Sequence, residues 1–227
     1  MPTRQKKQNK NQNKRNAPMR SLVQPRQQRR NAPMALATRT ISSTPGFGKD
    51  SFVVRDRVSV AYDVLSQGST GFAPVKFAIN PGLPQGTGGN AGPFSWIGAI
   101  ANKFERYKIH KLEFEYQGKT PSTDTGEFAM SVDYDSNDVD PVSTTEMLNN
   151  TGARSCKTWE NVVMALRTNT QPLMGRKTRS GNVPAENRED YDFGALYVYN
   201  RTTLPVGTII GRLWVKYSID LLLPQGS

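Results

Sequence analysis

Cysteine and histidine are almost absent from the 227 residues, since Cys156 and His110 are the only ones of their kind. One cysteine excludes a framework of internal disulfides and any zinc site built on cysteine. One histidine leaves little for catalysis that depends on imidazole. No apolar run approaches the roughly 18 residues of a membrane helix, and no apolar stretch typical of a secretory signal opens the chain. We therefore expect neither a membrane partner nor secretion.

Acidic residues are missing from the N-terminal segment, where the first carboxylate is Asp50. Eleven basic residues lie within residues 1–40. The other 19 Lys and Arg are balanced by 19 Asp and Glu, so the net charge of +11 lies at one end. This asymmetry is typical of a segment that binds a polyanion such as RNA, although a solubilising or localisation tail has the same composition. The basic residues are Arg4, Lys6, Lys7, Lys10, Lys14, Arg15, Arg20, Arg26, Arg29, Arg30 and Arg39.

Aromatic residues are also missing before Phe47. Gln, Asn, Lys, Arg and Pro dominate this stretch, which cannot bury enough apolar surface to offset the entropy lost on ordering. The sequence therefore predicts two parts. Residues 1–46 form a mostly disordered basic arm, and residues 47–227 form one domain, long enough for a sizeable core.

Alternation of apolar and polar side chains predicts that this domain is all-β. The alternation is clearest at 58–64, 112–116, 128–134 and 213–221, and further strands are expected near 72–79, 153–166 and 193–200. Turns rich in Gly, Pro and Asn separate these runs, without the rhythm of βαβ units. The pattern favours an antiparallel sandwich or barrel.

Two short helices are expected in the connections. Apolar residues fall at helical spacing between Trp96 and Phe104. The run from Ser143 to Glu146 has the form of a capping box, in which a serine begins a helix and a glutamate three residues later reaches back.

Two residues invite a catalytic interpretation. Asp124 stands in an Asp-Thr-Gly triplet like that of aspartic proteases, whose chemistry needs two carboxylates that share a proton. The triplet occurs once and follows a polar turn, so an aspartic hydrolase is a weak alternative. His110 would have to serve any Ser-His-Asp triad, but its charged neighbours favour a structural role.

A run of carboxylates from residue 133 to 140 is the most distinctive feature of the domain. Asp133, Asp135, Asp138 and Asp140 fall within eight residues at the end of a predicted strand. Hard oxygen ligands of this kind suit Ca²⁺. The alternative is a solvated acidic loop, because Asp and Asn favour turns and the spacing is not that of an EF-hand.

The ordered set of motifs resembles the shell domain of coat proteins from small icosahedral plant RNA viruses of the tombusvirus and sobemovirus type. The motifs are Phe104-Glu105-Arg106-Tyr107, Leu112-x-Phe114-x-Tyr116, Pro121-Ser122-Thr123 with Gly126, Asp133-Tyr134-Asp135-x-x-Asp138-x-x-Pro141 and Gly211-Arg212-Leu213-Trp214-Val215-x-Tyr217.

The resemblance implies an eight-stranded antiparallel jelly-roll sandwich that self-assembles around single-stranded RNA. It implies a shell of 180 copies with T = 3 quasi-symmetry and Ca²⁺ bound between subunits by Asp135 and Asp138, with Asp133 and Asp140 beside them. It also implies a smooth shell, because the chain stops three residues after Pro224 where some relatives continue into a protruding domain.

We therefore expect a viral capsid protein, not an enzyme, that is found in the virion and assembled in the host cytoplasm. Its partners would be copies of itself and the viral RNA, which the basic arm would bind. The alternative is a cellular single-stranded RNA-binding β-barrel protein with a basic tail.

Overall fold

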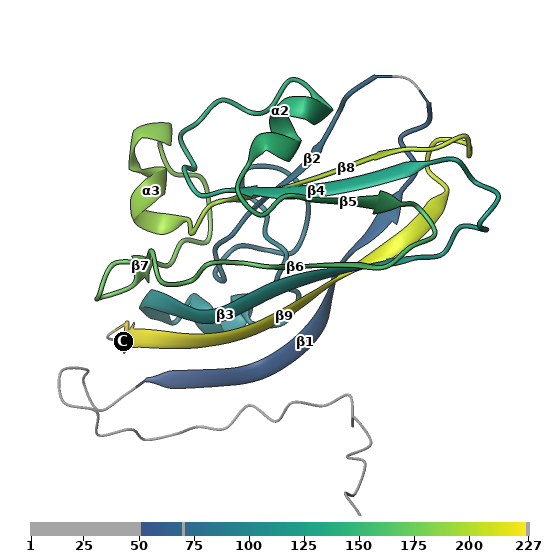
Figure 1. Ribbon diagram of the computed structural model, residues 1–227. Helices are drawn as coiled ribbons and strands as arrows, with labels where there is room; N and C mark the ends of the chain where they lie inside the picture. The colour runs from purple at the N-terminus through teal and green to yellow at the C-terminus, as the bar shows by residue number, and fades with distance from the viewer. Residues whose placement is uncertain (1–50, 70, 226–227) are drawn as a thin grey trace, which may run out of the picture. The chain divides into compact units, whose positions relative to one another are not determined.

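The computed structural model describes residues 51–69 and 71–225. Two antiparallel sheets pack face to face (Figure 1). The first has the order β1 (Phe52–Leu65), β9 (Ile209–Pro224), β3 (Phe104–Gly118) and β6 (Val162–Ala165), with β7 (Arg176–Lys177) also paired to β3. The second has the order β2 (Val75–Ala78), β8 (Ala195–Arg201), β4 (Glu127–Asp133) and β5 (Arg154–Lys157).

The core between the sheets follows from the period-two alternation of the strands. On β3 the side chains of Leu112, Phe114 and Tyr116 are buried, and every second residue between them is more exposed. Tyr116 stacks on Phe128 of β4 with ring centroids 3.7 Å apart, which joins the two sheets directly. Trp214 of β9 lies on the opposite face, where its indole N–H donates to Gln117.

The second sheet is covered on both faces. Its outer face carries Ala129, Tyr197 and Tyr199, which pack with Met147 in a smaller apolar cluster. Met147 belongs to α2 (Thr144–Asn149), which lies over β4 in Figure 1. Because α2 protects this face from water, β8 is buried on both sides and reads as a nearly continuous apolar run.

The first sheet instead exposes a charged outer face to solvent. Asp220 of β9 accepts a hydrogen bond from Arg55 of β1, and its Oδ2 lies 2.7 Å from the imidazole Nε2 of His110 on β3. Bulges in β1 and β3 turn these two side chains toward Asp220. The structure thus gives His110 a partner across three strands, in agreement with a structural role.

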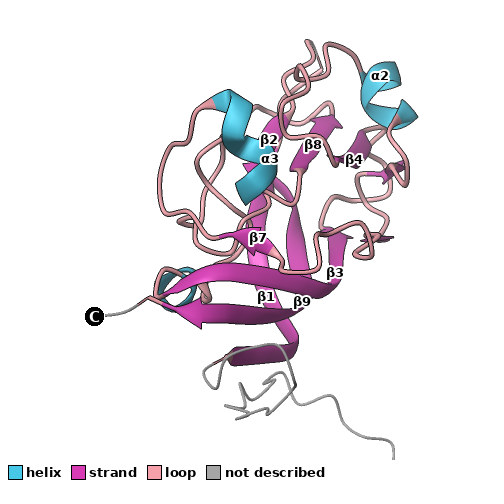
Figure 2. Ribbon diagram, turned by 90° about the vertical axis from the view of Figure 1, so that its left-hand side faces the viewer, coloured by secondary structure: helices cyan, strands magenta, loops and turns pink. Residues whose placement is uncertain are grey.

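Short helices occupy the connections, as Figure 2 shows. The capping box is confirmed, since the Ser143 hydroxyl accepts from the Glu146 backbone N–H at 3.2 Å. The helix expected between Trp96 and Phe104 is a single turn, α1 (Gly98–Ala101). The sequence did not predict β7, the 3-10 turn η1 (Ala185–Asn187) or α3 (Arg188–Tyr191). In the part of the chain that is described, no helix has the length and apolar character to cross a membrane.

The predicted all-β sandwich is confirmed, and eight longer strands carry it, with β7 contributing two residues. The basic arm at 1–46 and its eleven Lys and Arg residues lie outside the described residues. The arm, its boundary with the domain and its role in RNA binding therefore stay predictions.

Candidate functional site

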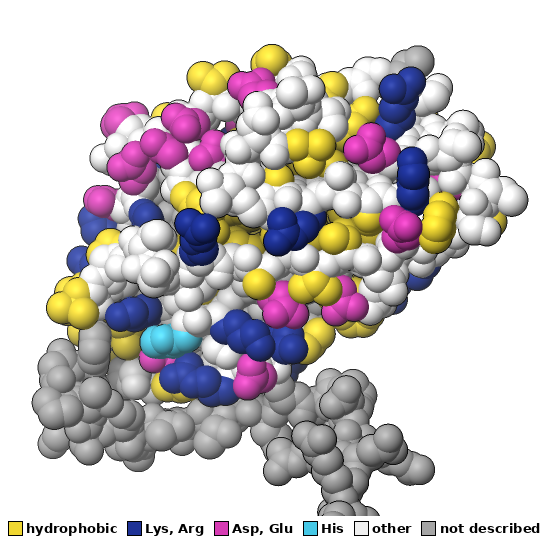
Figure 3. Space-filling view, viewed as in Figure 1, with side chains coloured by type: hydrophobic (Ala, Val, Ile, Leu, Met, Phe, Trp, Pro, Cys, Tyr) yellow, Lys and Arg dark blue, Asp and Glu magenta, His cyan; other side chains and the backbone are white. Residues whose placement is uncertain are grey.

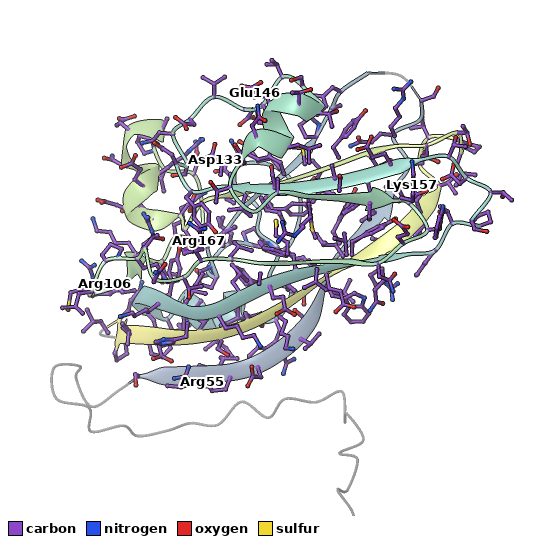
Figure 4. All side chains as sticks on the ribbon, in the orientation of Figure 1. Arg55, Arg106, Asp133, Glu146, Lys157 and Arg167 are labelled. Carbon is purple, nitrogen blue, oxygen red and sulfur yellow. The ribbon has the colours of Figure 1, made fainter. Side chains whose placement is uncertain are left out.

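The carboxylate run begins at the last residue of β4 and continues into the loop before α2. Asp133, labelled in Figure 4, accepts a hydrogen bond from the backbone N–H of Asp135 at 3.0 Å. Asp135 in turn accepts from the backbone N–H of Asn137 at 2.9 Å. These two turns fold the loop back on itself, so that Asp133, Asp135 and Asp138 interact electrostatically although they belong to an extended sequence.

Burial raises the pKa of Asp133, and the negative charges of Asp138 and Asp135 raise it further. The hydrogen bond from the Asp135 backbone N–H lowers the pKa but does not cancel these effects. The side chains of Asp135 and Asp138 lie at the loop surface, and Figure 3 shows acidic side chains gathered over this loop and α3. The loop therefore carries a concentration of negative charge that the chain only partly neutralises.

Asp140 is the exception within the run, because the chain neutralises it. Lys76 of β2 and the hydroxyl of Tyr197 on β8 both donate to its Oδ1, at 2.5 and 2.7 Å. Burial alone would raise the pKa of Asp140, but these hydrogen bonds and the positive charge of Lys76 outweigh it and lower the pKa. Nothing in the sequence near residue 140 indicated either partner, because both come from other strands.

A cavity of about 510 Å³ borders the run at Asp135. Its other walls include Glu189 and Asp190 of α3, together with Arg176 of β7. The acidic stretch from 186 to 192 is visible in the sequence, but only the fold brings it beside Asp135. The structure thus extends the acidic surface to residues that sequence reasoning missed.

The donor chemistry of this surface fits Ca²⁺, which takes six to eight oxygen ligands. However, within residues 51–69 and 71–225 no three His, Cys, Asp or Glu side chains lie close enough together to hold a metal ion. Asp140 is already engaged by Lys76 and Tyr197. Within one copy, Asp133, Asp135 and Asp138 therefore do not form a complete metal site by themselves.

Asp124 lies at the opposite end of β4, in the loop before that strand. Asp124 is 6% exposed. The hydroxyls of Thr158 and Thr202 donate to its Oδ2 at 2.6 and 2.9 Å, and that of Thr203 donates to its Oδ1 at 3.1 Å. Burial would raise the pKa of Asp124, but these hydrogen bonds outweigh it and lower the pKa. This carboxylate joins three loops, and both its oxygens are occupied, which does not suit an acid-base catalyst.

Comparisons with known proteins agree on one family. A family model described as "Viral coat protein (S domain)" matches residues 28–227. The chain is 29% identical over 199 residues to the capsid protein of tomato bushy stunt virus (strain Cherry), which covers 86% of this chain and 48% of that protein. It is 31% identical to the capsid protein of artichoke mottled crinkle virus, with the same coverage. The chain thus spans about half the length of these curated relatives.

Solved structures give the same fold. The chain superposes on a structure of tobacco necrosis virus with a TM-score of 0.65 and 16% identity, covering 78% of this chain and 98% of that one. At this identity the likeness concerns the fold alone. It confirms the jelly-roll arrangement that the sequence predicted.

Proposed function

The chain belongs to the viral coat protein (S domain) family, and from that premise we propose that it is the capsid subunit of a small icosahedral plant RNA virus. Copies assemble into the shell of the virion, and the basic N-terminal arm binds single-stranded genomic RNA inside it. Assembly takes place in the host cytoplasm. The match over residues 28–227 carries this proposal. The matched relatives are capsid proteins, so the chain is not an enzyme.

The distribution of charge supports separate roles for the two parts of the chain, with the domain forming the shell and the arm binding RNA. Beyond residue 40 the chain carries equal numbers of acidic and basic residues, so copies of the domain approach one another without long-range repulsion. The eleven positive charges of the arm remain available for phosphates. In a shell of 180 copies the arms supply roughly 2,000 positive charges, which suits a few kilobases of RNA through counterion release.

The arm has no aromatic side chain before Phe47, so bases have no ring to stack on. Contacts to the phosphate backbone therefore dominate over the recognition of base sequence. This composition suits packaging of a long RNA better than recognition of a short motif. A cellular RNA-binding barrel with a basic tail would share this arm, but the family match gives that alternative no support.

Calcium is the cofactor that best suits the carboxylate run. Asp135 and Asp138 would hold the ion, with Asp133 beside them, and a neighbouring copy would supply the remaining ligands. When bound, the ion supplies positive charge that offsets the repulsion among these carboxylates. Asp140 is less suited, because Lys76 and Tyr197 already bind it.

The test of the proposed function compares the full chain with two arm variants by electron microscopy and by the RNA content of purified particles. One variant lacks residues 1–40, and the other keeps the arm but has all eleven Lys and Arg residues replaced by Gln. We expect uniform RNA-filled shells from the full chain. We expect both variants to lose most of the RNA, because they lack the same positive charge.

A single replacement, Arg26→Gln, is the control, and it should barely change the RNA content, since arm charges act together. Shells of the deletion variant should be smaller or absent if the arm also selects between quasi-equivalent contacts. The Gln variant, which keeps the length of the arm, separates that effect from the loss of charge. Full RNA content in both variants, or no shells from the full chain, would contradict the proposal.

A further inference from the structure

The loop between β6 and β7 contains a turn at residues 171–175 that exposes two large apolar side chains. Leu173 is 78% exposed and Met174 is 45% exposed. Single exposed apolar residues are common on protein surfaces and need no explanation. This pair differs because the backbone that presents it is held firmly in place, beside the label β7 in Figure 1.

Gln171 fixes the start of the turn. Its side-chain amide accepts from the backbone N–H of Ile109 at 2.9 Å and donates to the backbone carbonyl of the same residue at 2.6 Å. The side chain thus makes the pair of hydrogen bonds that a neighbouring strand would make with β3, in the gap between β6 and β7.

Gly175 fixes the end of the turn. It has a φ of +70°, and a Cβ at this position would lie 2.3 Å from the carbonyl oxygen of Tyr107. Its N–H donates to the carbonyl of Pro172, and its carbonyl accepts from Arg106, which is labelled in Figure 4. Lys108 also donates to the carbonyl of Leu173. A turn held at this many points presents Leu173 and Met174 at little further cost in conformational entropy.

A cavity of about 350 Å³ lies elsewhere on the same domain, next to α1. Leu83, Pro84, Phe94 and Trp96 supply apolar walls, Ala99 of α1 lines it, and polar side chains complete it. For scale, a buried apolar cavity of about 150 Å³ holds a benzene molecule, so this one has room for one or two aliphatic side chains.

Charge permits the two surfaces to meet. The 171–175 turn adjoins the cavity beside Asp135 through Pro172, and the charged residues that line this cavity are Asp135, Glu189, Asp190 and Arg176. The chain that forms the α1 cavity has no carboxylate from residue 64 to 104, and the guanidinium of Arg57 lies 4.2 Å from the Trp96 ring centroid. The border of the turn thus carries both signs of charge, since Lys108 and Arg176 lie among the carboxylates, and like charges do not oppose its contact with a region whose 64–104 stretch has no carboxylate.

Resting on the proposed self-assembly, we propose that the 171–175 turn of one copy inserts Leu173 and Met174 into the α1 cavity of a neighbouring copy. The contact joins two different surfaces, the turn of one copy and the cavity of the other. A contact between two different surfaces repeats from copy to copy and closes into a ring when the rotation relating neighbouring copies permits. A closed shell requires rings of this kind. The partner is therefore a second copy of this chain.

Cross-linking tests the geometry. In a background of Cys156→Ala, which removes the only native thiol, Met174→Cys and Ala99→Cys are made as separate proteins and assembled in a mixture. Under mild oxidation the mixture should give disulfide-linked dimers, and each protein alone should give none. The double variant should give a ladder of longer chains. Dimers from Met174→Cys alone would indicate a twofold contact and overturn the proposal, as would a mixture without dimers.

A charge substitution tests the contribution of the turn. Leu173→Asp should lower the fraction of protein in particles at least tenfold in sedimentation. The matched control is Val206→Asp in the loop between β8 and β9, where Val206 is 77% exposed. It should assemble like the unmodified chain, and both variants should give unchanged thermal unfolding as free subunits.

Equal assembly of both variants and the unmodified chain would overturn the contact while leaving the capsid function intact. Equal failure of both variants would also overturn it, because the effect would then be one of surface charge in general. An unmodified chain that stays monomeric would contradict the capsid function itself, and this contact with it.

Discussion

Asp124 lies three residues before the seven-residue strand β4, and Asp133 is the last residue of that strand. The surroundings of these two carboxylates differ in their effect on the pKa. Three threonine hydroxyls donate to the carboxylate of Asp124, and its pKa is lowered. Asp133 receives a backbone N–H but faces Asp135 and Asp138, and its pKa is raised. At the Asp124 end of the strand, hydrogen bonds from the same chain therefore stabilise the negative charge of the carboxylate.

At the Asp133 end of the strand, the negative charges of Asp133, Asp135 and Asp138 are only partly compensated by groups of the same copy. A carboxylate that the fold satisfies costs nothing further, whereas repulsion among unpaired carboxylates lowers stability unless something outside the chain relieves it. The difference agrees with a structural role for Asp124 and with the role in binding an ion or a neighbouring copy that we propose for the surface around Asp133. The following predictions test this distinction.

The largest effect is expected from Asp124→Ala. The substitution leaves three hydroxyls without their acceptor and separates three loops, so we expect a loss of about 3–5 kcal/mol in the free energy of unfolding. Asp138→Ala at the other end should change it by less than about 0.5 kcal/mol, since Asp138 is exposed. Urea denaturation of the full chain, kept dissociated in high salt, measures both. Similar losses for the two variants would remove the distinction.

A smaller effect is expected from removal of Ca²⁺ at neutral pH. If the ion is present at about 100 times its dissociation constant, it contributes about 2.7 kcal/mol to the assembled state. Chelation should therefore swell or loosen the particles and lower their melting temperature. The double variant Asp135→Asn and Asp138→Asn should assemble but no longer respond to chelator. Light scattering with and without chelator checks this, and a response equal to that of the unmodified particles would exclude these two ligands.

The sequence alone predicts the strands, because the side chains of β3 and β9 alternate between the core and the outer surface over most of their length, with breaks such as the bulge in β3. It also gave the start of α2, because the capping box is a local pattern. It did not give α3 or β7, which are four and two residues long and have no periodicity to detect. β7 pairs with β3, and the hydroxyl of Tyr107 in β3 donates to the backbone carbonyl of Tyr191 in α3, so both elements depend on contacts that are distant in the sequence.

The candidate site was predicted in part for the same reason. Spacing identified the run from Asp133 to Asp140, but it could not show that Lys76 and Tyr197 bind Asp140, since both are more than 50 residues away. Spacing also could not bring Glu189 and Asp190 beside Asp135. The Asp-Thr-Gly triplet is a case in which a local motif was misleading. It suggested catalysis, whereas in the fold Asp124 accepts hydrogen bonds that hold loops together.

The dependence of stability on pH should have opposite signs at the two ends of β4. Because the pKa of Asp133 is raised in the folded chain, its penalty is absent below the ordinary carboxyl pKa of about 4 and grows as pH rises from there. Without metal, Asp133→Asn should therefore be more stable than the unmodified chain at pH 7, by less than about 1 kcal/mol because the site is partly solvated. The two should be equal near pH 3.

Asp124→Asn should behave in the reverse manner. Because the folded pKa of Asp124 is lowered, its contribution is present above the ordinary carboxyl pKa and is lost as pH falls through the folded value. The variant should thus be least stable, relative to the unmodified chain, at neutral pH. Thermal unfolding of dissociated subunits from pH 3 to 8 measures both variants, and curves of the same sign would show that the two ends do not differ.

The smallest effect concerns Asp140, which belongs to the run by sequence but, like Asp124, accepts hydrogen bonds from side chains of the same chain. Its partner Lys76 is only 18% exposed, whereas the Asp140 side chain is 58% exposed, so screening limits the ion pair to about 0.5 kcal/mol. Asp140→Asn should cost about this much in subunit unfolding and leave the chelator response of the particles unchanged. Asp138→Asn should do the reverse, with no loss of subunit stability and a weaker response to chelator. If instead Asp140→Asn removed the chelator response, Asp140 would be a calcium ligand that leaves Lys76 and binds the ion on assembly. All four carboxylates of the run would then belong to the calcium site.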